Sequence, residues 1–195
     1  MARRSAAAAQ QSEGGGGPDP RPRRGVVAPG DADPVEWVRH HWEQQSLPDP
    51  DRFAAVASLL RLRELVASEF DRELRSFEIN RSMYFLLATL VMSPAGARRL
   101  NYLSRYLLVH PTTITLLVDQ LEKRGMVKRM PDAKDRRASL ATLTPAGRAV
   151  MKEATRALAE TGYGLGAVSD RDLRQLIESM RTARAALRDV DTASG

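Results

Sequence analysis

The chain has 195 residues and a mass of 21.6 kDa, which leaves room for one ordinary domain with tails and excludes a large multidomain enzyme. It contains no cysteine, which excludes disulfides, thiolate metal sites and cysteine nucleophiles. The formal net charge is +6, and residues 95–152 carry twelve Lys and Arg against four Asp and Glu. The rest of the chain is slightly acidic, so this stretch is either a solvated charged face or the binding surface for a polyanionic partner.

No part of the chain predicts a membrane or export segment. The longest apolar run, residues 83–92, has ten residues, whereas a spanning helix needs about 20. The first residues lack the apolar core of a signal peptide. We therefore expect a cytoplasmic protein without a membrane partner.

Composition separates a tail from the ordered remainder. Residues 1–32 are rich in Ala, Gly, Pro and Arg, which predicts a disordered tail. A helix-start signature at Asp33, followed directly by proline, predicts an extra N-terminal helix over 33–48. Apolar residues then recur at helical spacing and predict one long amphipathic helix over 49–78.

The next region predicts a helix-turn-helix. A buried helix is expected over 79–92 and a two-turn helix over 100–107. His110 and Pro111 then open a second helix, with His110 as its cap. Two helices with so short a connection form the helix-turn-helix pattern.

A wing and further helices complete the predicted fold. Apolar and polar residues alternate on both sides of a charged turn at 131–137, which predicts a two-stranded hairpin. Thr144 and Pro145 begin another helix, and glycines at 162–166 act as a hinge before a terminal amphipathic stripe. The expected fold class is all-α with a small β-wing.

Three motifs carry a resemblance to a known family. The segments LEKRGMV at 121–127, DRRASLATLT at 135–144 and PAGR at 145–148 resemble the winged-helix core of the MarR (multiple antibiotic resistance regulator) family. Asp135 and Arg137 stand at the family's Asp-x-Arg spacing before a Leu-Thr pair.

The resemblance implies a winged helix-turn-helix DNA-binding domain at 79–148, with dimerisation helices at 49–78 and 149–190. It implies a sequence-specific transcriptional regulator, more often a repressor, that binds a pseudo-palindromic operator in double-stranded DNA as a homodimer. A small-molecule effector is also implied. A winged helix that binds protein instead of DNA is the alternative, and the basic wing favours DNA. No enzymatic activity and no cofactor are expected.

Candidate DNA contacts follow from the chemistry of the side chains on these elements. Short hydroxyl side chains at the start of the recognition helix suit close approach to base edges, and basic side chains beyond it suit phosphate neutralisation. Arginines at a hairpin tip can reach the minor groove. The resemblance suggests Arg137 as the inserted arginine, with Asp135 holding the wing in shape through a salt bridge. The predicted set is Thr112, Thr113, Thr115 and Lys123 in the recognition helix, Asp135, Arg136 and Arg137 in the wing, and Arg124, Lys128 and Arg129 at phosphates.

One position and one segment depart from the family pattern. Leu108 occupies the turn where family members often have glycine, so a positive φ there would be strained. Residues 111–122 contain no Arg or Lys, which leaves hydroxyl and methyl contacts and DNA shape to carry specificity.

Ligand sites other than DNA are less evident in the sequence. Candidates for the effector site are Trp37, Arg81 and Tyr84, because an anion needs a cation and a ring needs a stacking partner. Trp37 also has the helical spacing of a core aromatic residue. No metal site is expected, because the adjacent His40 and His41 point apart on one helix.

Overall fold

The structure is a computed structural model that describes residues 33–132 and 135–187, and of Arg136 and Arg137 it describes the backbone only. The tail predicted over 1–32 lies outside these residues. The chain forms two compact units, with the boundary between Ala54 and Ala55. No helix among the described residues is both long enough and apolar enough to span a membrane.

The first unit contains the predicted extra helix. This helix, α1 (Pro34–Gln44), is capped by Asp33, whose carboxylate accepts a 2.9 Å hydrogen bond from the amide two residues further on. The indole ring of Trp42 stacks on Phe53 with 3.7 Å between the ring centroids. Its N–H group donates to the carbonyl oxygen of Pro48 over 2.9 Å.

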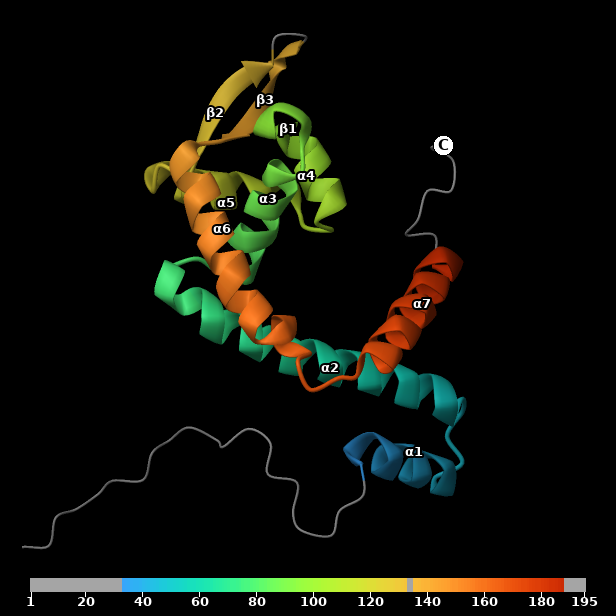
Figure 1. Cartoon of the computed structure of the whole chain (residues 1–195). Helices are drawn as coiled ribbons and strands as arrows, with labels where there is room; N and C mark the ends of the chain where they lie inside the picture. Colours follow the sequence, from blue (N-terminus) through green and yellow to red (C-terminus); the bar gives the residue numbers. More distant parts are fainter. Residues whose placement is uncertain (1–32, 133–134, 188–195) are drawn as a thin grey trace, which may run out of the picture. The chain divides into compact units, whose positions relative to one another are not determined.

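The remaining elements follow the predicted order, with one additional strand (Figure 1). They are α2 (Pro50–Leu74), η1 (Arg75–Phe77), α3 (Arg81–Val91), η2 (Pro94–Gly96), β1 (Ala97–Arg99), α4 (Leu100–Tyr106), α5 (Pro111–Lys123), β2 (Val127–Asp132), β3 (Asp135–Leu143), α6 (Pro145–Glu160), η3 (Gly162–Gly164) and α7 (Asp170–Ala186). The all-α fold with a β-wing is confirmed.

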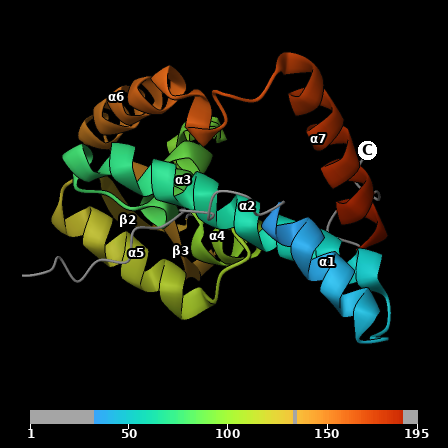
Figure 2. The same cartoon turned by 90° about the horizontal axis from the view of Figure 1, so that it is seen from below.

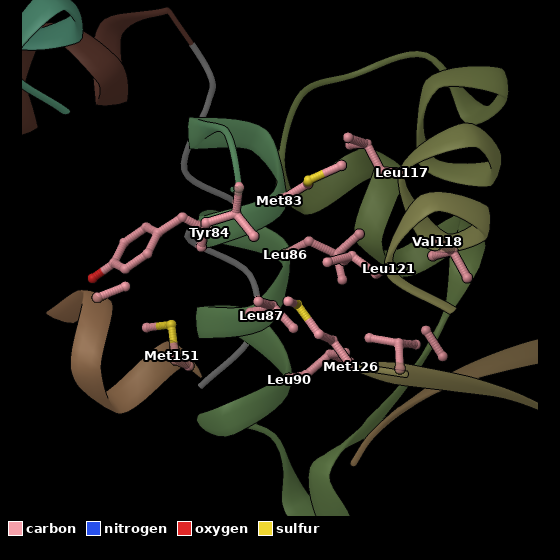
Figure 3. Packing of buried hydrophobic residues seen from close by; sticks show 14 of the residues in the cluster. Met83, Tyr84, Leu86, Leu87, Leu90, Leu117, Val118, Leu121, Met126 and Met151 are labelled. Carbon is pink, nitrogen blue, oxygen red and sulfur yellow. The ribbon is translucent and has the colours of Figure 1, made fainter. Parts of the chain in front are cut away.

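The core of the second unit is built around α3, with α5 and α6 on opposite sides of it (Figure 2). Leu86, Leu87 and Leu90 of α3 are fully buried, as is Leu121 of α5 (Figure 3). Complete burial of one such leucine side chain contributes roughly 1.5–3 kcal/mol. This packing fixes the recognition helix on its apolar face.

The sheet has three strands in the order β1-β3-β2, all antiparallel, so the prediction of a two-stranded wing is corrected. Strand β1 has only three residues and its partner lies some forty residues along the chain, so no local alternation marks it. The wing strands are also longer than predicted, because Pro131, Asp132 and residues 135–137 belong to strands and not to the turn. Pro131 is tolerated because β2 is an edge strand.

Helix α6 begins where the sequence predicts. The Thr144 hydroxyl accepts from the Gly147 amide over 3.0 Å and donates to the Gly125 carbonyl over 2.7 Å. A Cβ atom at Gly147 would overlap the carbonyl oxygen of Met126. The cap and the glycine together hold the start of α6 against the segment that joins α5 to β2.

Candidate nucleic-acid interface

The recognition helix α5 begins at a side-chain cap. The Nδ1 atom of His110 accepts from the amide of Thr112 over 3.3 Å and lies 3.1 Å from the hydroxyl of the same residue. The predicted capping role of His110 is thereby confirmed. One face of α5 packs against the core, and the opposite face is open. The buried residues of the helix are Ile114, Leu117, Val118 and Leu121.

The exposed face of α5 carries the residues predicted to meet DNA. Thr112, Thr113 and Thr115 are all exposed at its N-terminal end, and Lys123 is exposed at the other end. Lys128 is exposed on the adjoining strand β2. Within the described part of the chain, neither lysine has an ion-pair partner. Their charges are therefore available to an external anion.

Arg129 has a different environment from the two lysines. Its guanidinium pairs with Asp119, lies 3.7 Å from a carboxylate oxygen of Glu122, and donates to the carbonyl of Thr115 over 3.1 Å. The Arg129 amide also donates to the Glu122 carboxylate over 2.9 Å. The residue thus neutralises two carboxylates of α5 and fastens β2 to that helix. The contact of Arg129 with a DNA phosphate that the sequence predicts stays a prediction.

Arg124 is the C-cap residue of α5 and is exposed. Its guanidinium donates to the backbone carbonyl of Glu78, a residue with φ of 54° just before α3. One donor group of Arg124 is therefore used within the protein, although the residue as a whole is exposed.

A partly buried ion pair at the end of β2 was not predicted. Arg99 of β1 places its Nη2 atom 2.5 Å and its Nε atom 2.6 Å from one carboxylate oxygen of Asp132. Asp132 is only 8% exposed. No local motif signals this pair, because its members are 33 residues apart. The pair links β1 to the end of β2.

The wing residues themselves are described in part. Asp135 is exposed at the start of β3, and the backbones of Arg136 and Arg137 continue that strand. The side chains of Arg136 and Arg137 lie outside the described residues, so their contacts with DNA and the Asp135 salt bridge remain predictions.

The turn between α4 and α5 has the predicted strain. Leu108 has φ of 52° and a side chain that leaves the residue 78% exposed. The Leu108 amide donates to the backbone carbonyl of Arg105 over 3.3 Å, and the Val109 amide donates to the backbone carbonyl of Ser104 over 3.0 Å. These two bonds close α4 and turn the chain into α5.

Two of the predicted effector residues, Arg81 and Tyr84, have partners of their own. Arg81 pairs with Asp71 at 2.9 Å, while the buried Tyr84 hydroxyl lies 3.2 Å from that of Thr155. Burial raises the pKa of Tyr84 above its ordinary value. Trp37 belongs to the first unit, where its exposed ring stacks on His41.

Comparisons with known proteins agree with this architecture. The model of the MarR family matches residues 79–139. The structure is similar to Sco5413, a MarR family transcriptional regulator from Streptomyces coelicolor, with a TM-score of 0.68 and 30% identity, covering 72% of this chain and 98% of that one. Sco3205, another such regulator from the same organism, was solved in complex with DNA; its TM-score is 0.63 at 25% identity, with 68% and 88% of the two chains covered. The HTH-type transcriptional regulator PrsX of Escherichia coli is 29% identical over 132 residues, which are 67% of this chain and 78% of that protein.

Proposed function

Since the chain belongs to the MarR family of transcriptional regulators, which carry a DNA-binding winged helix, we propose that it is a repressor that binds a pseudo-palindromic operator as a homodimer and responds to a small molecule. The observation that carries the proposal is the open N-terminal face of α5. Three hydroxyl side chains lie exposed there, on a helix whose other face is fixed in the core.

The side chains on and around α5 fall into groups with different proposed roles in DNA binding. The threonines Thr112, Thr113 and Thr115 approach base edges in the major groove, where hydroxyl and methyl groups read both polar and apolar features. Lys123 and Lys128 neutralise phosphates and set the register of the protein on the duplex. Arg136 and Arg137 of the wing reach the adjacent minor groove.

Apolar surface on α2 and α7 supports the homodimer. No residue of α7 is buried, although its apolar positions repeat at helical spacing. A groove of about 440 Å³ between α2 and α7 is almost wholly apolar. Its larger apolar side chains are Val56, Leu59, Leu62, Leu176 and Met180. Covering this surface with a second copy would remove it from water and space two recognition helices about 34 Å apart.

The test is fluorescence anisotropy with the DNA upstream of the protein's own gene and a scrambled duplex, repeated across salt concentrations. We expect tighter binding to the native duplex and a steep salt slope. Lys123→Ala should lower the slope by about one on both duplexes. Thr113→Ala should weaken binding to the native duplex more than to the scrambled one, and Lys152→Ala on α6 serves as the matched control. Equal weak binding to both duplexes would contradict sequence-specific recognition, and no binding at low salt would favour the protein-interaction module.

A further inference from the structure

The middle of the exposed face of α5 is apolar. Leu116 is 56% exposed, although it lies within the helix and not at its end. Successive residues of an α-helix are rotated by about 100°, so Leu116 shares one stripe with Thr112, a turn earlier, and Lys123, two turns later. The buried residues of α5 lie on the opposite side of the helix. A large apolar side chain therefore stands at the centre of the face that is proposed to enter the major groove.

The carboxylates near Leu116 are paired within the protein. Asp119, three residues further along the helix, pairs with the guanidinium of Arg129. Glu122 accepts from the amide of Arg129 over 2.9 Å and lies 3.7 Å from its guanidinium. This pairing weakens the repulsion that the two carboxylates exert on DNA phosphates. The face around Leu116 can therefore approach a duplex closely enough for an apolar contact.

A leucine in the major groove favours one base over the other three. Thymine presents a C5-methyl group there, whereas the code of the remaining bases consists of hydrogen-bond donors and acceptors. Leu116 can satisfy neither a donor nor an acceptor, so packing against one removes water from a polar group without replacing its hydrogen bond. Packing against a thymine methyl instead buries apolar surface on both partners.

The neighbouring threonines are less selective than this leucine. Thr113 and Thr115 are exposed close to Leu116, and each carries both a hydroxyl and a methyl group. A hydroxyl donates as well as accepts, so it can adapt to several base edges. The side chain of Leu116 offers only an apolar surface. The threonine methyl groups can also meet thymine, so a test has to separate their contacts from those of the leucine.

We propose that Leu116 is a specificity-determining residue that contacts the C5-methyl group of a thymine in each half-site of the operator. The inference rests on the proposed function and adds to it the identity of one base pair. In a two-fold symmetric complex this T·A pair occurs at symmetry-related positions of the two half-sites.

The test starts from an operator that the full-length chain selects out of a pool of randomised duplexes. The thymines of the two half-sites are replaced, one symmetry-related pair at a time, by deoxyuridine, which lacks only the C5-methyl group. We expect at least one pair of replacements to weaken wild-type binding about tenfold in fluorescence anisotropy, because one methyl contact is lost in each half-site.

Leu116→Ala identifies the side chain that meets this methyl group. The residue is exposed and alanine favours helix, so the variant should keep the circular dichroism of the wild type. It should bind the thymine operator about tenfold more weakly, and deoxyuridine at the sensitive pair should weaken its binding no further. Thr113→Ala should still lose affinity when that pair is replaced. Met92→Ala, an exposed apolar position at the end of α3, is the matched control and should behave as the wild type does.

Each other outcome counts against the proposal in a different way. An unchanged deoxyuridine effect in Leu116→Ala would show that another side chain meets the methyl group. Undiminished operator affinity of this variant would overturn the proposal and leave the leucine to a protein contact. A selected operator that tolerates deoxyuridine at every thymine would refute thymine recognition while leaving sequence-specific binding intact. If the selection enriches no sequence, the proposed function fails together with this inference.

Discussion

Leu108 combines a strained backbone conformation with an exposed side chain. Its left-handed backbone conformation costs about 1–2 kcal/mol for a residue with a Cβ atom. We predict that Leu108→Gly raises the free energy of unfolding by about 1 kcal/mol, measured by urea denaturation at fixed protein concentration. Leu116→Gly, the same exchange at an exposed position inside α5, should lower it by about 1 kcal/mol. A destabilised Leu108→Gly protein would show that the turn carries no strain.

Tyr84 predicts a dependence of stability on pH. Burial raises the pKa of its phenol, so folding favours the neutral form over the phenolate. The stabilisation is complete below the unfolded pKa of about 10 and is lost as the pH rises through the higher folded pKa. Tyr84→Phe should lose about 1 kcal/mol at pH 8 through the missing bond to Thr155, and should lose less than the wild type on going to pH 11. Parallel declines in the two proteins, followed by circular dichroism in urea, would contradict this assignment.

At the scale of the elements, the sequence predicted the helix caps and the wing hairpin but not the third strand of the sheet. Asp33, His110 and Thr144 each hold an amide within their own helix, so a local pattern of capping residue and proline specifies the start. Strand β1 depends on a partner far along the chain and carries no alternation of its own. The exposed hydroxyls of α5 followed from helical periodicity, whereas the pairing of Arg129 required knowing how β2 lies against α5.

The Arg99–Asp132 pair is predicted to hold the wing at its angle to α5. Arg99→Ala takes away this partner of a buried carboxylate, and we expect it to lower the free energy of unfolding by about 2 kcal/mol and DNA affinity by about tenfold. Adding Asp132→Asn should restore part of the stability, because the buried charge is then removed, and a thermodynamic cycle over the two positions measures the coupling. Arg105→Ala, an exposed arginine of α4, is the matched control. Additive effects of the two changes would show that the pair does not act as a unit.

At the scale of the whole molecule, the two proposed tasks, DNA binding and dimerisation, are assigned to two different surfaces. The lobe around α3 buries its own core beneath α5, α6 and the sheet. Helix α7 has no buried residue, and the apolar stretch of α2 beside it is equally uncovered, with Val56, Leu59 and Leu60 each 55% exposed. Exposed apolar surface on this helix pair is the basis for the proposed homodimer.

Removal of α7 should therefore separate folding from dimerisation. A chain ending at Ala167 is expected to keep the helical circular dichroism of the remaining elements, to sediment as a monomer, and to lose DNA affinity by about 100-fold because its two half-site contacts no longer act together. A chain ending at Leu187 keeps all of α7 and is the control, expected to remain dimeric. Analytical ultracentrifugation decides the outcome. A folded dimer from the shorter chain would place the interface elsewhere, and a monomer with undiminished operator affinity would mean that recognition does not depend on two-fold symmetry.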